Sequence, residues 1–157
     1  KSKLIPTATV ITPNRNEAEV LADMSITCES DITTAANRIL QDLGPQVVII
    51  KGGHIGEDAT DYAFTKDGSV RTWSSPKYDT VHTHGTGCTF SAVITAELAK
   101  GCDVMDAIGI AKDYIALAIK HNPGLGNGCG PVNHMAYGLL SNGPETMDEL
   151  LKDDERR

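Results

Sequence analysis

The stretch from Thr83 to Ala92 combines residues that could bind an anion with one that could act on it. Gly85 and Gly87 stand one residue apart before a long apolar run, which predicts a tight loop that opens onto the N-terminus of a helix. Backbone N–H groups are free there and the helix dipole adds partial positive charge, so a phosphate can bind. Cys88 falls in the first helical turn, where the same field is expected to favour a thiolate. We therefore treat Gly85–Cys88, which includes Thr86, as a candidate anion cradle that contains a potential base.

The same spacing also has a purely structural interpretation. A Gly-x-Gly before a helix is often only a tight loop, and a cysteine at that place is often a small buried hydrophobic residue. Two common phosphate-binding fingerprints do not fit, since the chain has neither Gly-x-x-x-x-Gly-Lys-Ser/Thr nor a complete Gly-x-Gly-x-x-Gly. Spacing alone supports the two interpretations about equally.

Asn14 and Glu17 follow the first expected strand, which covers the β-branched run Thr7–Thr12 and stops at Pro13. Ligands of open α/β sheets bind at the carboxyl ends of the strands, so both side chains are candidates for a site. Their spacing is also that of a capping box, with Asn as the cap of a short helix that ends at Met24. On spacing alone the capping box is favoured.

An amphipathic helix and a second strand come next. Apolar residues recur with helical spacing from Ile32 to Leu43, Ser30 or Asp31 could cap the start, and Gly44 ends the helix. The unbroken apolar run Gln46–Lys51 is typical of a parallel strand covered on both faces, so these elements predict a βαβ unit.

Lys51 stands at the end of that second strand, where Gly52, Gly53 and His54 follow it. From its position alone, this lysine could simply extend its ammonium group to solvent. The two glycines could equally form an ordinary turn. Further on, Asp67-Gly68 between two β-prone runs predicts an antiparallel hairpin.

Two helices are expected in the second half of the chain. The first starts at the anion cradle and runs to about Lys100, and the second is capped by Asp103 and is apolar on nearly every side, which predicts burial. Lys112 lies on this second helix, where it could pair with Asp113 or face solvent. The loop Pro123–Pro131 contains four glycines and has unusual backbone freedom.

The overall composition is that of an ordinary globular domain. The chain has 157 residues, a hydrophobic content of 40% and a formal net charge of −7, and this acidity argues against a nucleic-acid partner. No apolar run approaches the ~18 residues of a membrane span, and we expect no membrane association. The four cysteines form no Cys-x-x-Cys pair, so a reducing cytoplasm is the expected location.

Four motifs together resemble one family. The string His84–Thr89 is similar to the anion-hole signature of hydroxymethylpyrimidine/phosphomethylpyrimidine kinases, a thiamine-pathway branch of the ribokinase-like superfamily that carries Cys where most of the superfamily has Asp. Thr12–Glu17, Lys51–His54 and Gly128–His134 match further motifs in the order of the family. The resemblance covers roughly Pro6 to His134.

This resemblance implies an α/β fold: a three-layer ribokinase-like sheet with helices on both faces, mostly parallel, with one β-hairpin. Whole kinases of this kind have a further N-terminal portion with most of the pyrimidine site, so residues 1–140 are expected to form only the C-terminal, nucleotide-binding portion. Residues 141–157 are expected to be a charged tail. The implied reaction is ATP-dependent phosphorylation of hydroxymethylpyrimidine and then of its monophosphate.

The resemblance also implies roles for individual residues. Cys88 would be the base and the backbone of Gly85, Thr86 and Gly87 would stabilise the transferred phosphoryl group. Glu17 would hold Mg²⁺ through water, and the contacts to ATP would come from Asn14, Lys51, Lys112 and Gly128. The chain departs from the family at Val81-His82, where many relatives have Lys-Asn, and at Asn127, where a basic residue is common.

Three alternatives stay open at this point. Relatives with the same loop phosphorylate pyridoxine or pyridoxal, so the acceptor could be a pyridoxal-type molecule. The chain could also be a catalytically incomplete nucleotide-binding fragment, whose open sheet edge pairs with an N-terminal portion or with a second copy in a homo-oligomer. A dinucleotide-binding dehydrogenase is the weakest alternative, because Gly85-Thr86-Gly87 lacks the third glycine.

Overall fold

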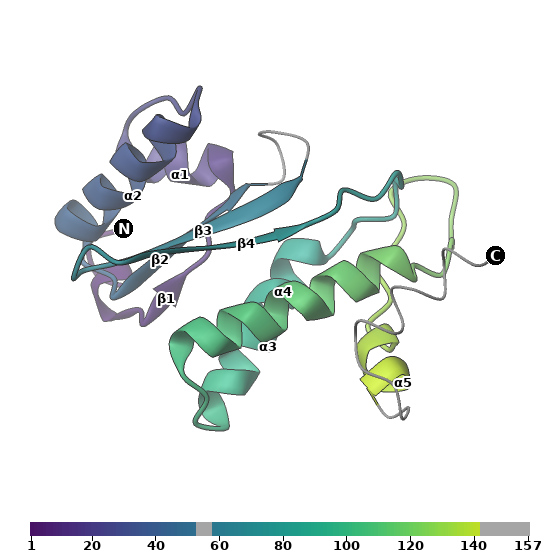
Figure 1. The fold of residues 1–157 in the computed structure, drawn as a ribbon. Coiled ribbons are helices and arrows are strands. Elements are labelled where there is room, and N and C mark those ends of the chain that lie inside the picture. The colour runs from purple at the N-terminus through teal and green to yellow at the C-terminus, as the bar shows by residue number, and fades with distance from the viewer. Residues whose placement is uncertain (53–57, 142–157) are drawn as a thin grey trace. The chain divides into compact units, whose positions relative to one another are not determined.

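The computed structural model describes residues 1–52 and 58–141 and divides into two compact units (Figure 1). Unit 1 is Lys1–Lys77 and unit 2 is Tyr78–Arg157. Gly53 and His54, predicted to follow the second strand, lie outside the described residues, as does the expected charged tail beyond Ser141.

Unit 1 contains a four-stranded sheet in the order β1-β2-β3-β4. The strands are β1 (Val10–Ile11), β2 (Val47–Gly52), β3 (Ala59–Thr65) and β4 (Val70–Ser75). β1 pairs with β2 in parallel, whereas β2–β3 and β3–β4 are antiparallel. The α/β class and the hairpin are confirmed, but the expectation of a mostly parallel sheet is wrong for the described residues. The segment between β2 and β3 is too short for the crossover that a parallel partner needs, so β3 returns antiparallel.

β1 is much shorter than the strand predicted over Thr7–Thr12. Ile5–Thr7 forms a 3₁₀ turn instead, and the hydroxyl of Thr7 donates to the carbonyl oxygen of Leu4 at 2.8 Å. Pro6 favours this turn because its ring fixes φ near the helical value and because it has no N–H to give to a ladder. The β-branched run therefore becomes a strand only from Val10.

α1 (Arg15–Ala22) and α2 (Glu29–Leu43) pack on one face of this sheet (Figure 1). The predicted apolar stripe of α2 is the buried one, and Gly44 ends the helix in the left-handed conformation, as expected. Its start is different from the prediction, since Cys28 is the N-cap and Asp31 occupies the third helical position. The core of unit 1 joins this stripe to side chains from the sheet: Val48, Ile50 and Phe64.

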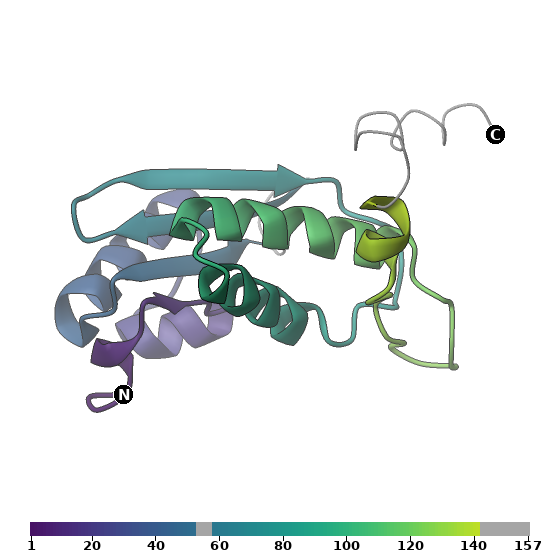
Figure 2. The same ribbon diagram turned by 90° about the horizontal axis from the view of Figure 1, so that it is seen from below.

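Unit 2 contains α3 (Thr86–Ala99), α4 (Val104–Lys120) and α5 (Ala136–Ser141), and α3 and α4 lie side by side (Figure 2). Asp103 caps α4, as predicted, by accepting a hydrogen bond from the N–H of Met105 at 2.8 Å. Six of the seven buried positions of α4 lie on one face of the helix, and Leu117 is the exception. Most of the other positions are half-buried, so the burial predicted from the apolar pattern is only partly confirmed. No helix in the described ranges is long and apolar enough to cross a membrane.

Candidate functional site

In unit 1 the structure brings two of the four motifs together at the end of β1 and β2. The N–H of Lys51 donates to the carbonyl oxygen of Pro13 at 3.0 Å, and Asn14 and Lys51 form a parallel bridge just beyond the β1–β2 ladder. A single backbone bridge therefore holds the start of the Lys51 motif beside the Thr12–Glu17 motif.

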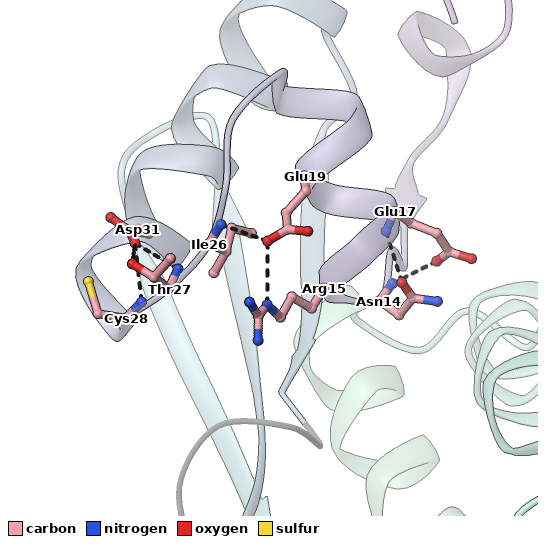
Figure 3. A network of polar contacts seen from close by, with 8 residues as sticks. All are labelled: Asn14, Arg15, Glu17, Glu19, Ile26, Thr27, Cys28 and Asp31. Carbon is pink, nitrogen blue, oxygen red and sulfur yellow. Dashed lines mark hydrogen bonds and ion pairs between the residues drawn. The ribbon is translucent and has the colours of Figure 1, made fainter.

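Asn14 and Glu17 form the capping box that their spacing predicted (Figure 3). The side-chain oxygen of Asn14 accepts from the N–H of Glu17 at 2.9 Å, and Oε2 of Glu17 accepts from the N–H of Asn14 at 2.7 Å. The box starts α1 at Arg15, directly after the predicted cap, and the helix ends at Ala22, two residues before the predicted Met24. It engages only one carboxylate oxygen of the exposed Glu17, so Oε1 faces outward without a hydrogen-bond partner among the described residues.

A cavity of about 590 Å³ lies beside this capping box. Asn14 and Glu17 line it together with apolar side chains, among them Ile11, Val20 and Leu21. Val20, one of the residues that line the cavity, is 66% exposed. The polar end of the cavity thus coincides with the end of β1, where the sequence predicted a site.

Gly52 and Asp61 fix the backbone just after Lys51, and the sequence analysis did not single out this pair. Oδ1 of Asp61, a side chain only 8% exposed, accepts from the N–H of Gly52 at 3.0 Å. A Cβ at position 52 would lie 1.7 Å from the carbonyl oxygen of Thr60 on β3, so only glycine fits. The available signal was a lone aspartate in a strand-like run, since a buried carboxylate needs a partner.

Figure 3 also shows an ion pair within α1, between Arg15 and Glu19, and polar contacts in the connection from α1 to α2. Oε1 of Glu19 accepts from the N–H of Ile26 at 2.8 Å, and Oδ2 of Asp31 accepts from the N–H and the hydroxyl of Thr27, each at 2.8 Å. The hydrogen bonds from Thr27, followed by those from Cys28, lower the pKa of Asp31 from 3.8 to about 2. These contacts shape the connection between the helices and stand apart from the candidate site.

In unit 2 the predicted loop and helix start are confirmed. Gly85 is the N-cap of α3 with φ of 89°, a conformation that glycine adopts without strain, and Cys88 lies exposed in the first turn. The hydroxyl of Thr86 donates to the carbonyl oxygen of Thr83 at 2.7 Å, which closes the turn in front of the helix. The N–H groups of Gly87 and Cys88 have no acceptor within the described residues, so two donors of the anion cradle are available.

The Gly128–His134 motif lies alongside this cradle. The N–H of His84 donates to the carbonyl oxygen of Gly130 at 3.0 Å, and the N–H of Val132 donates back to the carbonyl oxygen of His84 at 3.2 Å. Thr89 Oγ1 and His134 Nε2 form a further contact at 3.0 Å. Unit 2 therefore brings the other two motifs together.

The glycines of the Pro123–Pro131 loop differ in the structural reason for which glycine is needed, either a positive φ or a lack of space for a Cβ. Gly124 and Gly126 have positive φ angles of 62° and 88°. Gly130 has no room for a Cβ. Gly128 shows neither feature, because its φ is not positive and a Cβ there would meet no heavy atom within 4 Å. The described fold thus gives no reason for glycine at 128.

Cys129 is a second exposed thiol beside the cradle, and the sequence analysis did not single it out. Its Sγ lies 3.8 Å from Oγ1 of Thr83. Hydrogen bonding to the backbone of Thr83, then to its hydroxyl and to the backbone of His84, lowers the pKa of Cys129 below its usual value. The thiolate is therefore favoured at a position next to the anion cradle.

Lys112 is 6% exposed on α4, which rules out the alternative of a solvent-facing lysine. Partial burial raises the pKa of the neighbouring Asp113 carboxyl, and the positive charge of Lys112 opposes that rise. The structure thus separates the predicted residues into two groups. Unit 1 joins Asn14, Glu17 and Lys51, and unit 2 joins the cradle and Gly128, with Lys112 on the helix packed against α3. No cluster of three or more metal-binding side chains occurs in the described part of the chain.

The phosphomethylpyrimidine kinase family model matches residues 1–133. The chain belongs to this family. The hydroxymethylpyrimidine/phosphomethylpyrimidine kinase of Staphylococcus aureus strain MRSA252 is 49% identical over 95% of this chain and 53% of its own length. The Haemophilus influenzae enzyme of the same name is also 49% identical, over 88% of this chain and 52% of its own length. The chain thus spans about half the length of the curated relatives it matches.

Solved structures agree with this assignment of the phosphomethylpyrimidine kinase fold. The ADP complex of Bacillus subtilis pyridoxal kinase superposes on this chain with a TM-score of 0.82 at 43% sequence identity. The match covers 88% of this chain and 52% of the pyridoxal kinase chain. Pyridoxal kinase from Staphylococcus aureus in complex with AMP-PCP gives a TM-score of 0.80 at 36% identity, over 85% of this chain and 50% of that one. The family and the ribokinase-like α/β fold expected from the four motifs are therefore confirmed.

Proposed function

We propose that this chain is the nucleotide-binding portion of an ATP-dependent kinase that phosphorylates hydroxymethylpyrimidine and its monophosphate. The observation that carries the proposal is the start of α3, where Gly85 turns the backbone and the N–H groups of Gly87 and Cys88 have no acceptor in the described chain. Such donors at a helix N-terminus suit a phosphate. They occur in a family whose curated members bear this kinase name.

ATP fits groups that are present in each of the two units. Gly128 offers a backbone without a side chain and without steric conflict, which is what the close approach of a phosphate or ribose requires. Lys51 and Lys112 would supply positive charge to the phosphates, and Asn14 would contact the nucleotide at the end of β1. Phosphoryl transfer depends mainly on such positioning and charge neutralisation.

Mg²⁺ fits Glu17 as a ligand through water. This ion keeps several of its waters and usually binds few protein carboxylates together with substrate phosphates. One exposed carboxylate with a free oxygen, beside a second polar side chain, matches that preference better than a closed cage of ligands would. The bound ion would neutralise charge on the phosphates of ATP.

Cys88 is the proposed base. Its thiolate would accept the proton of the substrate hydroxymethyl group, whose oxygen forms a bond to the γ-phosphorus as the bond to the bridging oxygen breaks and ADP leaves. The N–H groups of Gly87 and Cys88 would donate to the oxygens of the phosphoryl group during transfer. The exposed position of Cys88 in the first turn of α3 supports both roles.

The direct test measures ADP release from Mg·ATP with and without hydroxymethylpyrimidine. Release that depends on the pyrimidine, and that falls by two or more orders of magnitude in Cys88→Ala, supports the kinase and the base. If Cys88→Ala retains a near-normal kcat, Cys88 is not the base. A titration with ADP separates the remaining cases, because binding without turnover identifies an incomplete enzyme that needs further polypeptide.

Pyridoxal is the second candidate acceptor, because the similar solved structures include pyridoxal kinases. The curated relatives of higher identity favour the pyrimidine. Running the same ADP assay with pyridoxal in place of hydroxymethylpyrimidine, at matched concentrations, separates the two. A higher kcat/KM for pyridoxal would reverse our assignment of the substrate.

We further propose that turnover requires a partner for the outer edge of β1, either an N-terminal portion or a second copy of the chain. β1 is the last strand of the sheet on that side, and the cavity that it lines carries exposed apolar side chains. Uncovered sheet edges of this kind tend to pair. Light scattering after size exclusion distinguishes a homo-oligomer from a monomer that lacks its partner.

A further inference from the structure

Position 130 requires glycine because neighbouring atoms leave no room for a Cβ, and not because of its backbone conformation. Its φ is not positive, unlike those of Gly124 and Gly126. A Cβ at position 130 would lie 2.0 Å from Nδ1 of His82, 2.9 Å from Cε1 of the same ring and 2.5 Å from the carbonyl oxygen of Leu125. The imidazole of His82 therefore lies directly against the Cα of Gly130.

The backbone of His82 is fixed from another direction. Its N–H donates to the hydroxyl oxygen of Thr80 at 3.1 Å, and the side-chain amide of Asn122 donates to the same oxygen at 3.4 Å. Asn122 stands just after α4. The segment that leads into the anion cradle therefore has two contacts. Thr80 is hydrogen-bonded to Asn122 after α4, and the ring of His82 packs against the Pro123–Pro131 loop.

The ring of His82 is not held by a hydrogen bond at its inner nitrogen. Nδ1 is buried and has no partner within the part of the chain that the structure describes. A buried polar atom without a partner costs free energy, so a ring in this place needs another reason. The close fit against Gly130 supplies one, since the ring fills space between two backbone segments.

We propose that His82 is a positioning residue that sets the separation between the anion cradle and the Pro123–Pro131 loop. Gly130 provides the carbonyl oxygen that accepts the N–H of His84, and His84 directly precedes Gly85. A change in the volume of the ring at 82 therefore shifts the backbone that leads into the cradle. Only the consequence for phosphate binding rests on the proposed function, and the steric role stands apart from it.

A double-mutant cycle tests the steric role without any ligand. Gly130→Ala places a methyl group against the His82 ring and is expected to speed hydrogen exchange of the His84 and Val132 amides by about ten-fold or more. In the double variant His82→Ala/Gly130→Ala, exchange is expected to slow again toward the wild-type rate. Recovery is incomplete because the carbonyl of Leu125 still opposes the methyl group.

Gly128→Ala is the matched control, since a Cβ at 128 meets nothing and exchange at His84 and Val132 should stay unchanged. If the double variant exchanges as fast as Gly130→Ala, the proposal is wrong. If Gly130→Ala does not fold, His82→Ala alone decides the matter. Faster exchange at the two amides, with the amides of α2 unchanged, supports the proposal, and unchanged exchange overturns it.

Binding of ADP by calorimetry separates this inference from the proposed function. We expect Gly130→Ala to weaken ADP binding and the double variant to regain part of it. If the wild-type chain binds no ADP, the proposed function fails while the exchange results still decide the steric role. If the wild type, Gly130→Ala and the double variant bind ADP equally despite altered exchange, the separation set by His82 has no bearing on phosphate binding, and that part of the proposal is overturned.

Discussion

The two units bring their motifs together with the same device and support it differently. In each unit one parallel bridge joins a motif to a second one distant in sequence, Asn14 to Lys51 in unit 1 and His84 to Pro131 in unit 2. The first bridge continues the β1–β2 ladder, and side chains of β2 belong to the hydrophobic core of unit 1. The second joins two loops and is supplemented by side-chain contacts such as Thr89 with His134.

The difference corresponds to what each unit would offer to the proposed ligand. Unit 1 presents charged and amide side chains, Glu17, Lys51 and Asn14, at the end of a sheet. Unit 2 presents backbone N–H groups at the start of α3, whose direction depends on the turn at Gly85. A side chain can adjust by rotation, whereas a backbone donor moves only with its loop. We therefore expect the site residues of unit 2 to be more sensitive to packing changes in neighbouring loops.

The largest expected effect tests how firmly the sheet of unit 1 fixes its bridge. Gly52→Ala places a Cβ 1.7 Å from the carbonyl oxygen of Thr60 and should destabilise unit 1 by about 3 kcal/mol, because backbone atoms on both sides must move. Trp73 on β4 is the only tryptophan, so its fluorescence during urea unfolding reports on this unit.

Gly128→Ala is the control in unit 2, with an expected change below about 0.5 kcal/mol because its Cβ meets no atom. A Gly52→Ala variant as stable as the wild type would show that the backbone of β3 moves easily to make room for the methyl group. The sheet of unit 1 would then not be the firmer support of the two.

Asn14 tests whether the bridge of unit 1 serves only folding. Asn14→Ala removes the cap of α1 and should cost about 1 kcal/mol in urea unfolding. Asn14→Asp keeps an acceptor oxygen for the N–H of Glu17 and should retain most of the stability. We expect Asn14→Asp nevertheless to bind Mg·ADP more weakly, because a second carboxylate lies beside Glu17 and alters the water and nucleotide contacts. Unchanged binding would assign Asn14 to helix capping alone.

Local patterns gave most of the elements. The apolar stripe from Ile32 to Leu43 predicted α2, and the capping box at Asn14 predicted the start of α1 at Arg15. Pro6 shortened β1, because the turn it favours competes with strand formation at Thr7. Local preference thus sufficed wherever the competing structure was also local.

Contacts between distant segments were beyond such patterns. The hydrogen bond from Gly52 to Asp61 depends on the register of β2 against β3, and the contact of His82 with Gly130 depends on how two loops meet. Neither residue pair has a fixed spacing in sequence. The motifs predicted which residues belong to the candidate site, whereas the bridges that join the motifs in pairs required the fold.

A smaller effect should come from the charge of Asp31 in unit 1. Its pKa in the folded chain is about 2, below the ordinary 3.8, so its charge contributes stability that is present above about pH 4 and lost as the pH falls toward 2. Asp31→Asn keeps an acceptor oxygen for Thr27 but removes the charge. We expect the variant to be slightly less stable than the wild type at pH 7, with the difference shrinking below pH 4. A difference independent of pH would assign the effect to geometry and not to charge.

The smallest expected effect concerns the thiol in the loop of unit 2. Hydrogen bonds from Thr83 and His84 lower the pKa of Cys129, so more of it is thiolate at pH 7 and it should react with iodoacetamide faster than an ordinary exposed thiol. Thr83→Val removes the hydroxyl and leaves the backbone contribution, so the rate should fall only a few-fold. Peptide mass spectrometry gives the rate for Cys28, an exposed thiol of unit 1, in the same sample, and that rate should not change. A Cys129 rate that is insensitive to Thr83→Val would mean that backbone donors alone favour the thiolate, as they do for the anion proposed at the start of α3.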